Sequence, residues 1–377
     1  MRSIRRAGNL RGKRVLVRGG LNETMDGEAL RGDFRLRKML PLLTFLREAG
    51  ARTILVGHVS GVGSSRTLQP VARYFAHHVP VSFIGDLFDE HGRAARAGMH
   101  DGEIVLAENL RRYPGEVAGD AAFASELAAL ADSYVNEDFS TSHRPHASIV
   151  LVPQLLPGYA GLQFEQEYKQ LSRALNPPHP SLVIIGGAKP ETKVPLIRQF
   201  LDVADRVFVG GLSANEFFLK MGHTIGSSLV SGKDLGVESL IGHPKLMLPK
   251  DVRVLSGGTT TVEKRPEELT EDDRIVDVGP ETLVALAATI AESASIVWNG
   301  PLGDSDRSFL AGTEHLAHLI ADSGVLSIIG GGDTIACIEP LGIERRVTFL
   351  STAGAAMINF LLNGTLPGIE ALKRSPR

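Results

Sequence analysis

The chain has 377 residues, of which 43% are hydrophobic and 22% charged, and its net charge is −3 at neutral pH. A chain of this length is too long to fold around one hydrophobic core, so we expect two domains. The balanced charge argues against a nucleic-acid surface, and the single cysteine, Cys337, excludes an internal disulfide framework and a cysteine-based zinc site. Because no apolar run approaches the ~20 residues of a membrane span or follows the basic start as in a signal peptide, we expect a cytoplasmic protein that binds no membrane.

The first half of the chain alternates short apolar runs with stretches of helical periodicity. A helix is predicted over 36–51, where Leu36, Met39 and Leu43 share one face, and another over 121–131. The predicted strands are 14–18, 53–57, 81–84, 103–107, 133–136 and 149–152. Such alternation predicts βαβ units and a parallel sheet.

A polar helix over roughly 162–174 is followed by prolines, which end it. The alternation then resumes. The predicted strands are 182–185, 206–209, 253–255, 295–298, 326–329 and 347–350, and the predicted helices are 193–202, 214–221, 281–291 and 314–321, the last capped by Thr313. We therefore expect two Rossmann-like, three-layer α/β/α domains with parallel sheets, joined by a helix.

Three predicted strands of the second half end in glycine-rich turns that carry a charge or an amide. These turns are Gly186-Gly-Ala-Lys189, Trp298-Asn-Gly-Pro301 and Gly330-Gly-Gly-Asp-Thr334. At the carboxyl edge of a parallel sheet, such turns direct backbone N–H groups toward one crevice, which is how α/β proteins hold phosphate chains. No Walker A motif is present. Taken singly, each turn is equally compatible with an ordinary helix cap.

Charged side chains near these turns suit phosphoryl transfer. Lys189 and Lys193 are four residues apart at a helix start and would face a phosphate together. Asp333 could bind Mg²⁺ held by nucleotide phosphates, Thr334 could bond a phosphate, and Asp306 could accept bonds from a ribose. Gly210-Gly211 forms a further strand-to-helix turn.

The first half offers scattered cations at predicted strand ends and helix starts. They are Arg35, His58, Arg111, His143, Arg144 and His146. If these ends converge, they would form a basic pocket for a small anionic substrate. A histidine zinc site in the segment 141–146 is weakly supported, because neither a cysteine nor a carboxylate pair accompanies it.

The ordered motifs resemble the phosphoglycerate kinase family over nearly the whole chain. The matching segments are Lys13-Arg-Val-Leu-Val-Arg18, Asp33-Phe-Arg-Leu-Arg37, Glu108-Asn-Leu-Arg111, Thr141-Ser-His-Arg-Pro-His146, Gly186-Gly-Ala-Lys189, Val297-Trp-Asn-Gly-Pro301, Gly330-Gly-Gly-Asp-Thr334 and Ser351-Thr352. The resemblance implies reversible phosphoryl transfer between Mg·ATP and the carboxylate of 3-phospho-D-glycerate, in glycolysis, by a hinge-bending monomer. It also implies a triose domain, 1–160 completed by 353–377, an interdomain helix, 161–176, a nucleotide domain, 177–352, and an active site in the cleft between the domains.

The resemblance further implies roles for single residues. Arg35, Lys189 and Lys193 resemble the catalytic cations, and Arg35 also belongs with Asn22, His58, Arg111 and Arg144 to the triose-binding set. The nucleotide-binding set is Gly187, Lys189, Lys193, Gly211, Asn299, Pro301, Asp306, Gly331, Gly332, Asp333 and Thr334. Asp333 resembles the residue that holds Mg²⁺ through the nucleotide.

Several positions depart from the family pattern. The family's Val-Asp-x-Asn is Gly19-Gly20-Leu21-Asn22 here, so the carboxylate expected to bond the substrate hydroxyl is absent. Gly61 replaces a phosphate-binding arginine. Two alternatives therefore stay open: a kinase for another small carboxylate, and a non-catalytic nucleotide-binding member of the family. A nicotinamide dehydrogenase is disfavoured, because no G-x-G-x-x-G opens an early βαβ unit.

Overall fold

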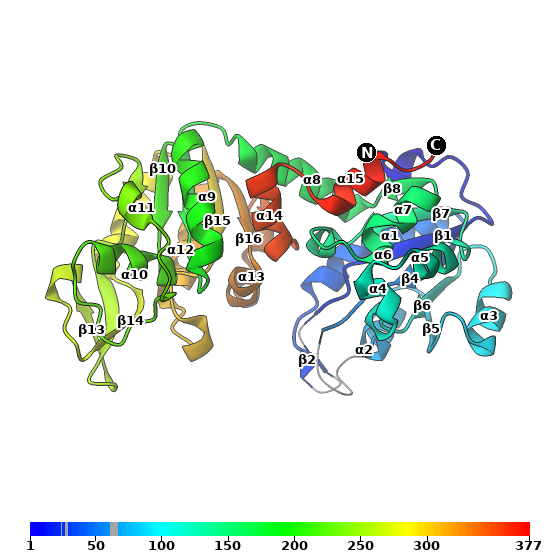
Figure 1. Ribbon diagram of the computed structural model, residues 1–377, viewed down its shortest axis with the longest axis horizontal. Coiled ribbons are helices and arrows are strands. Elements are labelled where there is room, and N and C mark those ends of the chain that lie inside the picture. The colour runs from blue at the N-terminus through cyan, green and yellow to red at the C-terminus, as the bar shows by residue number, and fades with distance from the viewer. Residues whose placement is uncertain (24, 27–28, 61–66) are drawn as a thin grey trace. The chain divides into compact units, whose positions relative to one another are not determined.

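The computed structural model describes residues 1–23, 25–26, 29–60 and 67–377, which form two compact units (Figure 1). The first unit comprises Met1–Lys169 and Thr365–Arg377, and the second comprises Gln170–Gly364. The helix α8 (Leu162–Leu175) carries the chain from one unit to the other. The expected segment 353–377 is divided between them, because α14 (Ala355–Asn363) packs in the second unit and α15 (Pro367–Lys373) packs in the first.

The first unit is built on a six-stranded parallel sheet in the order β5-β6-β4-β1-β7-β8. The strands are β1 (Arg14–Gly19), β4 (Arg52–Val56), β5 (Ser82–Ile84), β6 (Ile104–Ala107), β7 (Ser133–Glu137) and β8 (Gly158–Ala160). The helices are α1 (Phe34–Glu48), α2 (Gln69–Ala76), α3 (Glu90–Ala97), α4 (Pro114–Ala118), α5 (Ala121–Ala128), α6 (Ala147–Val150), α7 (Val152–Leu155) and α15. β1 and β4 are buried along nearly their whole length and have apolar central residues, as strands covered on both faces require.

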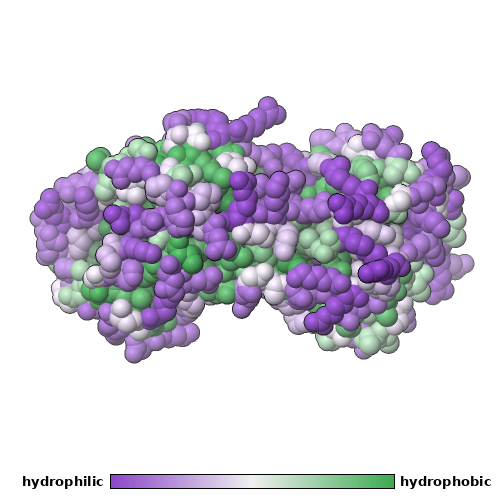
Figure 2. Space-filling view, turned by 90° about the horizontal axis from the view of Figure 1, so that it is seen from above, coloured by the Kyte–Doolittle hydropathy of each residue, from purple (hydrophilic) through white to green (hydrophobic). Residues whose placement is uncertain are grey.

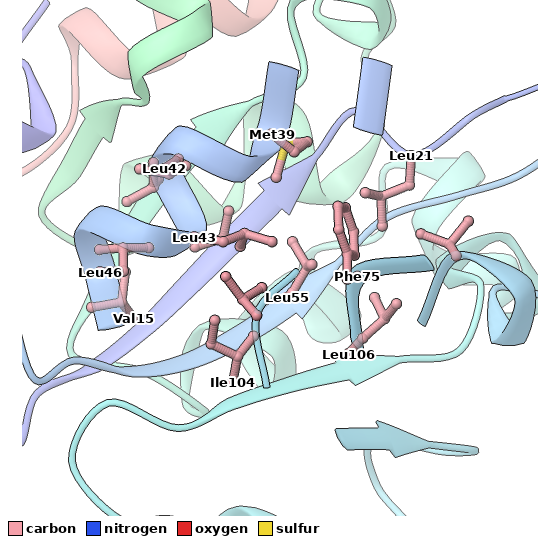
Figure 3. Close-up of a cluster of buried hydrophobic side chains, with 14 of the residues drawn as sticks. Val15, Leu21, Met39, Leu42, Leu43, Leu46, Leu55, Phe75, Ile104 and Leu106 are labelled. Carbon is pink, nitrogen blue, oxygen red and sulfur yellow. The ribbon is translucent and has the colours of Figure 1, made fainter. Parts of the chain in front are cut away.

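One face of this sheet packs against α1 and α2 (Figure 3). Val15 and Val17 of β1 belong to the same hydrophobic cluster as Leu43 of α1 and Phe75 of α2, and all four are fully buried. Each such side chain contributes about 1.5–3 kcal/mol to stability. Residues of opposite parity in a strand face the other way. Arg18 therefore points toward the layer on the other face, where α6 lies.

The predicted strand 149–152 is wrong. Ile149 lies in α6 and Val152 begins α7, where Pro153 occupies the first turn. The sixth strand is β8, a few residues later. A four-residue apolar run is compatible with a buried helix as well as with a strand, because periodicity does not separate the two at this length.

The second unit contains another six-stranded parallel sheet, in the order β11-β10-β9-β15-β16-β17. The strands are β9 (Ser181–Ile185), β10 (Arg206–Val209), β11 (Leu246–Met247), β15 (Ser295–Asn299), β16 (Leu326–Gly330) and β17 (Phe349–Leu350). The helices are α9 (Pro190–Val203), α10 (Gly211–Lys220), α11 (Pro280–Ala291), α12 (Ala311–Ser323), α13 (Gly332–Ile338) and α14. The two parallel sheets with flanking helices confirm the predicted fold class.

The predicted strand 253–255 belongs to a separate antiparallel sheet rather than to the parallel one. This sheet consists of β12 (Val252–Ser256), β13 (Thr260–Lys264) and β14 (Asp273–Val278) in the order β13-β12-β14. β13 is mostly exposed and polar, so it carries little hydrophobic signal in the sequence. Residues at the start of α12 were also misplaced: Thr313 is not its cap, because the helix begins at Ala311.

The remaining elements are short. They are the pair β2 (Met25–Asp26) and β3 (Ala29–Leu30), and the 3₁₀ helices η1 (Ile4–Arg6), η3 (Leu110–Arg112), η4 (Phe139–Thr141), η5 (Val237–Leu240), η6 (Pro266–Glu268), η7 (Ser305–Arg307), η8 (Glu339–Leu341) and η9 (Ile343–Arg346). Hydrophilic side chains dominate the face in Figure 2. No helix among the described residues is long and apolar enough to span a membrane.

Candidate active site

The three predicted glycine-rich turns meet in the second unit, because β9, β15 and β16 are neighbours in the sheet. Gly187 N–H donates to the carbonyl of Pro301 at 2.8 Å, and Gly300 N–H donates to Oγ1 of Thr334 at 2.8 Å. The turns enclose a cavity of about 370 Å³. Its lining is Gly187, Ala188, Lys189, Thr192, Lys193, Asn299, Gly300, Gly331, Gly332, Asp333, Thr334, Gly354, Ala355, Ile358 and Asn359.

Close approach of two turns explains the glycine at position 300. Gly300 has a φ of +101°, and a Cβ there would lie 2.1 Å from the carbonyl oxygen of Gly186. Any side chain would therefore push the turn after β15 away from the turn after β9. The absence of side chains keeps backbone groups at the cavity wall, where a phosphate chain can reach them.

Lys193 is the buried cation of this cavity. It lies in the first turns of α9, is 6% exposed, and donates from Nζ to Oδ1 of Asn299. Burial lowers its pKa from 10.5 to about 8, with a further lowering by Lys189 and an opposing effect of Asp333. At neutral pH Lys193 is still mostly protonated. An ammonium group that has lost much of its water is stabilised by an incoming anion.

Lys189 and Asp333 lie at the cavity with their side chains more exposed. Lys189 precedes α9, and Asp333 lies in the first turn of α13. The described residues contain no cluster of three or more histidine, cysteine, aspartate or glutamate side chains that could cage a metal ion. This donor set fits Mg²⁺, which typically takes one or two carboxylates and completes its shell with water and substrate phosphates.

A narrower slot lies in the same unit. It is lined by Gly211, Phe218, Asp277, Leu302 and Asp304, among others, and holds about 20 Å³. Gly211, which the resemblance places in the nucleotide-binding set, lies in its wall. Asp306, the predicted ribose ligand, is exposed in η7 and lines neither this slot nor the larger cavity. Asp304 lines the slot instead, and its carboxylate pairs with Arg274 at 3.0 Å.

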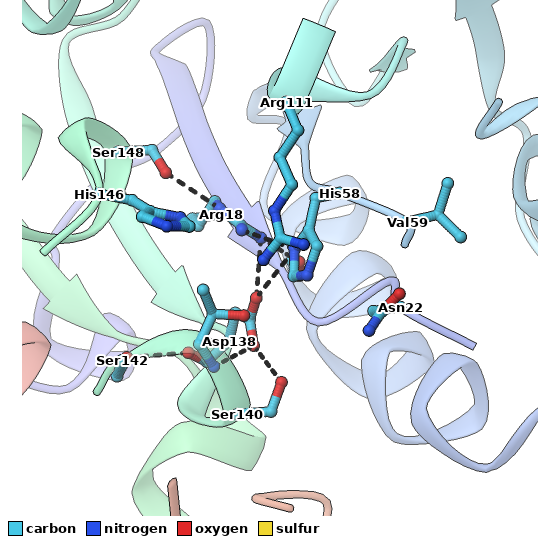
Figure 4. Close-up of polar contacts among 12 residues, drawn as sticks. Arg18, Asn22, His58, Val59, Arg111, Asp138, Ser140, Ser142, His146 and Ser148 are labelled. Carbon is cyan, nitrogen blue, oxygen red and sulfur yellow. Dashed lines mark hydrogen bonds and ion pairs between the residues drawn. The ribbon is translucent and has the colours of Figure 1, made fainter. Parts of the chain in front are cut away.

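In the first unit, a buried ion pair lies at the carboxyl edge of the sheet (Figure 4). Arg18 is the next-to-last residue of β1 and donates from Nη1 to Oδ2 of Asp138 at 2.8 Å, and neither side chain is exposed. Nε of Arg18 donates to Ser148 Oγ at 3.0 Å, and Nη2 lies 2.9 Å from Nδ1 of His58. Neither Arg18 nor Asp138 was among the predicted site residues.

Three other predicted residues of this unit, Arg35, Asn22 and Arg111, are linked to one another by a chain of hydrogen bonds through Ser60. Arg35 Nη1 donates to the carbonyl of Asn22 at 3.1 Å, and Asn22 Oδ1 accepts from Ser60 N–H at 2.7 Å. Ser60 Oγ accepts from Nη1 of Arg111 at 3.0 Å. The Arg111 guanidinium extends toward His58 and Arg18, as Figure 4 shows.

Arg111 is held in a cationic environment. Burial lowers its pKa, and the neighbouring charges of Arg144 and Arg18 lower it further. Arg144 is exposed in the turn that precedes α6. Like charges gathered at one place repel each other, so an anion bound there would relieve the repulsion. Gly61, which stands where the family pattern has a phosphate-binding arginine, lies outside the described residues.

Histidines do not add to this charge at neutral pH. Burial lowers the pKa of His58, His143 and His146, and nearby arginines lower it further. At neutral pH the segment 141–146 therefore carries one positive charge, that of Arg144, rather than three. His146 lies 3.8 Å from the buried Glu116, with no metal-ligand cluster at this place among the described side chains.

Sequence reasoning missed contributions from distant elements. Ile358 and Asn359 of α14 line the phosphate cavity, although they lie about 165 residues beyond Lys193. Glu23 pairs with Arg35, Oε2 to Nη1 at 3.2 Å. The one available signal was Arg18 itself, a charged residue that directly follows the apolar run Val15–Val17 in β1, which indicates a buried counter-ion.

Comparisons with known proteins agree with this geometry. The family model "Phosphoglycerate kinase" matches residues 4–364. Among curated relatives, a phosphoglycerate kinase of Caulobacter vibrioides is 35% identical, with 97% of this chain and 98% of the relative covered, and one of Dictyoglomus turgidum is 36% identical, with 97% and 96% covered.

Solved structures give the same result. The phosphoglycerate kinase of Coxiella burnetii is 33% identical, with a TM-score of 0.83 over 99% of this chain and 98% of that one. The enzyme of Pyrococcus horikoshii is 28% identical, with a TM-score of 0.87 over 99% of each chain. The similarity covers both units and their sheets, and so this chain belongs to the phosphoglycerate kinase family.

Proposed function

We propose that this chain transfers the γ-phosphoryl group of Mg·ATP reversibly to the carboxylate of 3-phospho-D-glycerate, giving ADP and 1,3-bisphosphoglycerate. The observation that carries the proposal is the cavity of the second unit, in which three backbone turns surround the buried ammonium of Lys193. Amide groups and a cation around a space of this size suit a phosphate chain. The arginine-rich edge of the first unit suits a small molecule with two anionic groups.

On the nucleotide side, each predicted residue has a separate task. Lys193 binds the transferring phosphoryl group and Lys189 an outer phosphate oxygen, while the N–H groups of Gly331 and Gly332 approach the phosphates. Asp333 would hold the magnesium ion, which supplies charge neutralisation at the phosphate oxygens when bound. Asn299, Pro301 and Thr334 keep the turns in place through the hydrogen bonds described above.

On the triose side, Arg35 orients the reacting carboxylate, and Asn22, His58, Arg111 and Arg144 bind the rest of the substrate. Arg35 is suited to this task because its guanidinium is half-buried at the start of α1 and anchored on one side by Glu23. The other N–H groups of its fork stay available for a bidentate contact with a carboxylate.

The chemical step needs no general base. A carboxylate is ionised at neutral pH, so its oxygen attacks the γ-phosphorus directly, the bond from that phosphorus to the β–γ bridging oxygen breaks, and ADP leaves with the electron pair. Catalysis then consists of positioning and of stabilising charge on the equatorial oxygens. Hinge closure would bring carboxylate and phosphoryl group into line and exclude water.

Gly20 favours a second candidate, a kinase for another small carboxylate. The absence of a side chain at this position removes an expected contact with the substrate hydroxyl. The two candidates differ in which acid is phosphorylated, while the nucleotide chemistry is the same. We further propose that the protein is a cytoplasmic monomer, which sedimentation at working concentrations would test.

A coupled assay that follows ATP consumption with 3-phosphoglycerate as acceptor tests the proposal. Wild type should turn over, and Arg35→Ala should lower kcat by about 10²–10³-fold, the usual loss for a transition-state donor. Arg37→Ala is the matched control, because Arg37 lies in the same helix and pairs with Asp33 at 2.6 Å. We expect it to change kcat less than threefold. Turnover with another carboxylate but none with 3-phosphoglycerate would replace the main candidate with the second.

A further inference from the structure

Gly20 leaves a space that a carboxylate from elsewhere in the chain borders. An added Cβ at Gly20 would meet no atom closer than 3.6 Å, and the nearest side-chain atom is Oδ1 of Asp138. Asp138 comes after β7, which pairs in parallel with β1. The carboxyl ends of adjacent parallel strands therefore bring position 138 beside position 20.

Asp138 is the counter-ion of a buried arginine. Oδ2 accepts from Arg18 Nη1 at 2.8 Å, and Oδ1 accepts from Ser140 Oγ at 2.6 Å and from Thr141 N–H at 3.0 Å. Since both charged side chains are removed from solvent, an arginine without this partner would be an uncompensated buried charge. A Cβ at position 20 would lie 3.6 Å from Oδ1 of Asp138, whose other oxygen contacts Arg18, so a carboxylate built at position 20 would enter the surroundings of this ion pair.

Neighbouring carboxylates are engaged elsewhere. Both oxygens of Glu137 accept from the backbone at the start of α8, from Gln163 N–H at 2.9 Å and Phe164 N–H at 3.0 Å. Glu116 accepts from the hydroxyl and the N–H of Ser148 at 2.7 and 2.9 Å. Among the described residues, Asp138 forms an ion pair with Arg18 and supplies the negative charge that balances the guanidinium.

The pair also determines the state of His58. A guanidinium only donates hydrogen bonds, so Nδ1 of His58, 2.9 Å from Arg18 Nη2, must accept. The neutral ring then carries its proton on Nε2. Asp138 thus fixes the guanidinium, and the guanidinium fixes the tautomer of a predicted triose-binding residue.

We propose that Asp138 replaces a carboxylate at position 20 in one respect, as the buried negative charge that pairs with Arg18, and not as a ligand of the substrate hydroxyl. It acts as a positioning residue, which holds Arg18 and, through it, His58 as an Nε2–H donor at the triose-binding edge. The identity of the ligand rests on the proposed function. The proposed exchange of a carboxylate at position 20 for one at position 138 does not depend on that function, because it concerns only the ion pair with Arg18.

Four proteins test this exchange: wild type, Asp138→Asn, Gly20→Asp/Asp138→Asn and the matched control Gly20→Asn/Asp138→Asn. Asparagine at 138 keeps an oxygen for Ser140 and Thr141 but loses the charge, so the variant should fold. The control adds the same volume at position 20 without charge. Titration calorimetry measures 3-phosphoglycerate and Mg·ADP binding, and ¹⁵N NMR of the histidine ring reports the His58 tautomer.

We expect Asp138→Asn to weaken 3-phosphoglycerate binding at least tenfold and to abolish the signature of an accepting Nδ1. Gly20→Asp should restore affinity to within threefold and recover the tautomer, whereas Gly20→Asn should do neither, and Mg·ADP affinity should be equal in all four. Equal behaviour of the two double variants, or wild-type affinity and tautomer in Asp138→Asn, would overturn the inference. If wild type itself fails to bind 3-phosphoglycerate, the proposed function fails, while the His58 tautomer in the four proteins still decides the exchange.

Discussion

Replacing Lys193 with methionine should stabilise the ligand-free protein while abolishing phosphoryl transfer. The pKa of Lys193 falls from 10.5 to about 8 because the ammonium group is buried. This difference, at 1.36 kcal/mol per pH unit, corresponds to a cost of about 3 kcal/mol for the charged form at pH 7. Methionine fills a similar volume without charge but loses the hydrogen bond from the charged ammonium to the buried Asn299, worth about 2 kcal/mol. The net gain is about 1 kcal/mol, or about 2–4 °C in Tm for a unit of this size.

The sign of this effect depends on pH. Between about pH 8 and 10.5 the unfolded chain binds more protons at this lysine than the folded protein does, so wild-type stability rises with pH in that window. By pH 9.5 the cost has fallen to about 1 kcal/mol, which the lost hydrogen bond outweighs. The variant should therefore be more stable than wild type at pH 7 and less stable at pH 9.5.

Denaturant unfolding at both pH values, without nucleotide, measures the difference. Lys189→Met is the control, because Lys189 lines the same cavity but is exposed. Its stability should stay within about 0.5 kcal/mol of wild type at both pH values. A Lys193→Met protein that is less stable than wild type at pH 7, or a difference that is the same at both pH values, would refute the reasoning.

Three further predictions concern the turns of the second unit. Thr334→Val should lower stability by about 1–3 kcal/mol, because the buried N–H of Gly300 loses its acceptor, and Thr334→Ser should not; thermal unfolding distinguishes them. Gly211→Ala should lower the free energy of unfolding by at least ~2 kcal/mol more than Gly232→Ala does. Both glycines have positive φ, but only at Gly211 would a Cβ lie 2.6 Å from a backbone nitrogen, that of Gly187. Equal losses of stability would show that this close approach is unimportant. Asp333→Asn should weaken ADP binding about tenfold or more with Mg²⁺ present and little without it; a loss of equal size without the metal would assign Asp333 another role.

Much of the fold follows from local pattern. The run Ser181–Ile185 is buried at every position and is followed by glycines, which is typical of a central parallel strand and its turn. The long helices and most strands lie within a few residues of their predicted bounds. Failures came where the local signal is ambiguous, as in the run 149–152, or weak, as in the polar strand β13.

The site divides in the same way. Lys193, Gly300 and Thr334 could be recognised because the glycine-rich turns and the lysine pair are short local patterns in the sequence. Asp306 lines neither of the two cavities described, and its predicted contact with a ribose stays a prediction, because the direction of an exposed loop depends on what packs beneath it. The helix α14 was assigned to the wrong neighbours, since a C-terminal segment carries no local mark of the surface that it covers.

The amino-acid sequence by itself determined the strand–turn–helix order, the backbone positions that must be glycine, and the family to which the chain is related. These properties depend on conformational limits of single residues and on short-range spacing. Only the tertiary structure decided that Lys193 is buried, that α14 closes one side of the phosphate cavity, and that Asp138 stands beside the empty place at Gly20. The charge of a side chain is local, but its desolvation and its counter-ion are contributed by residues more than a hundred positions away.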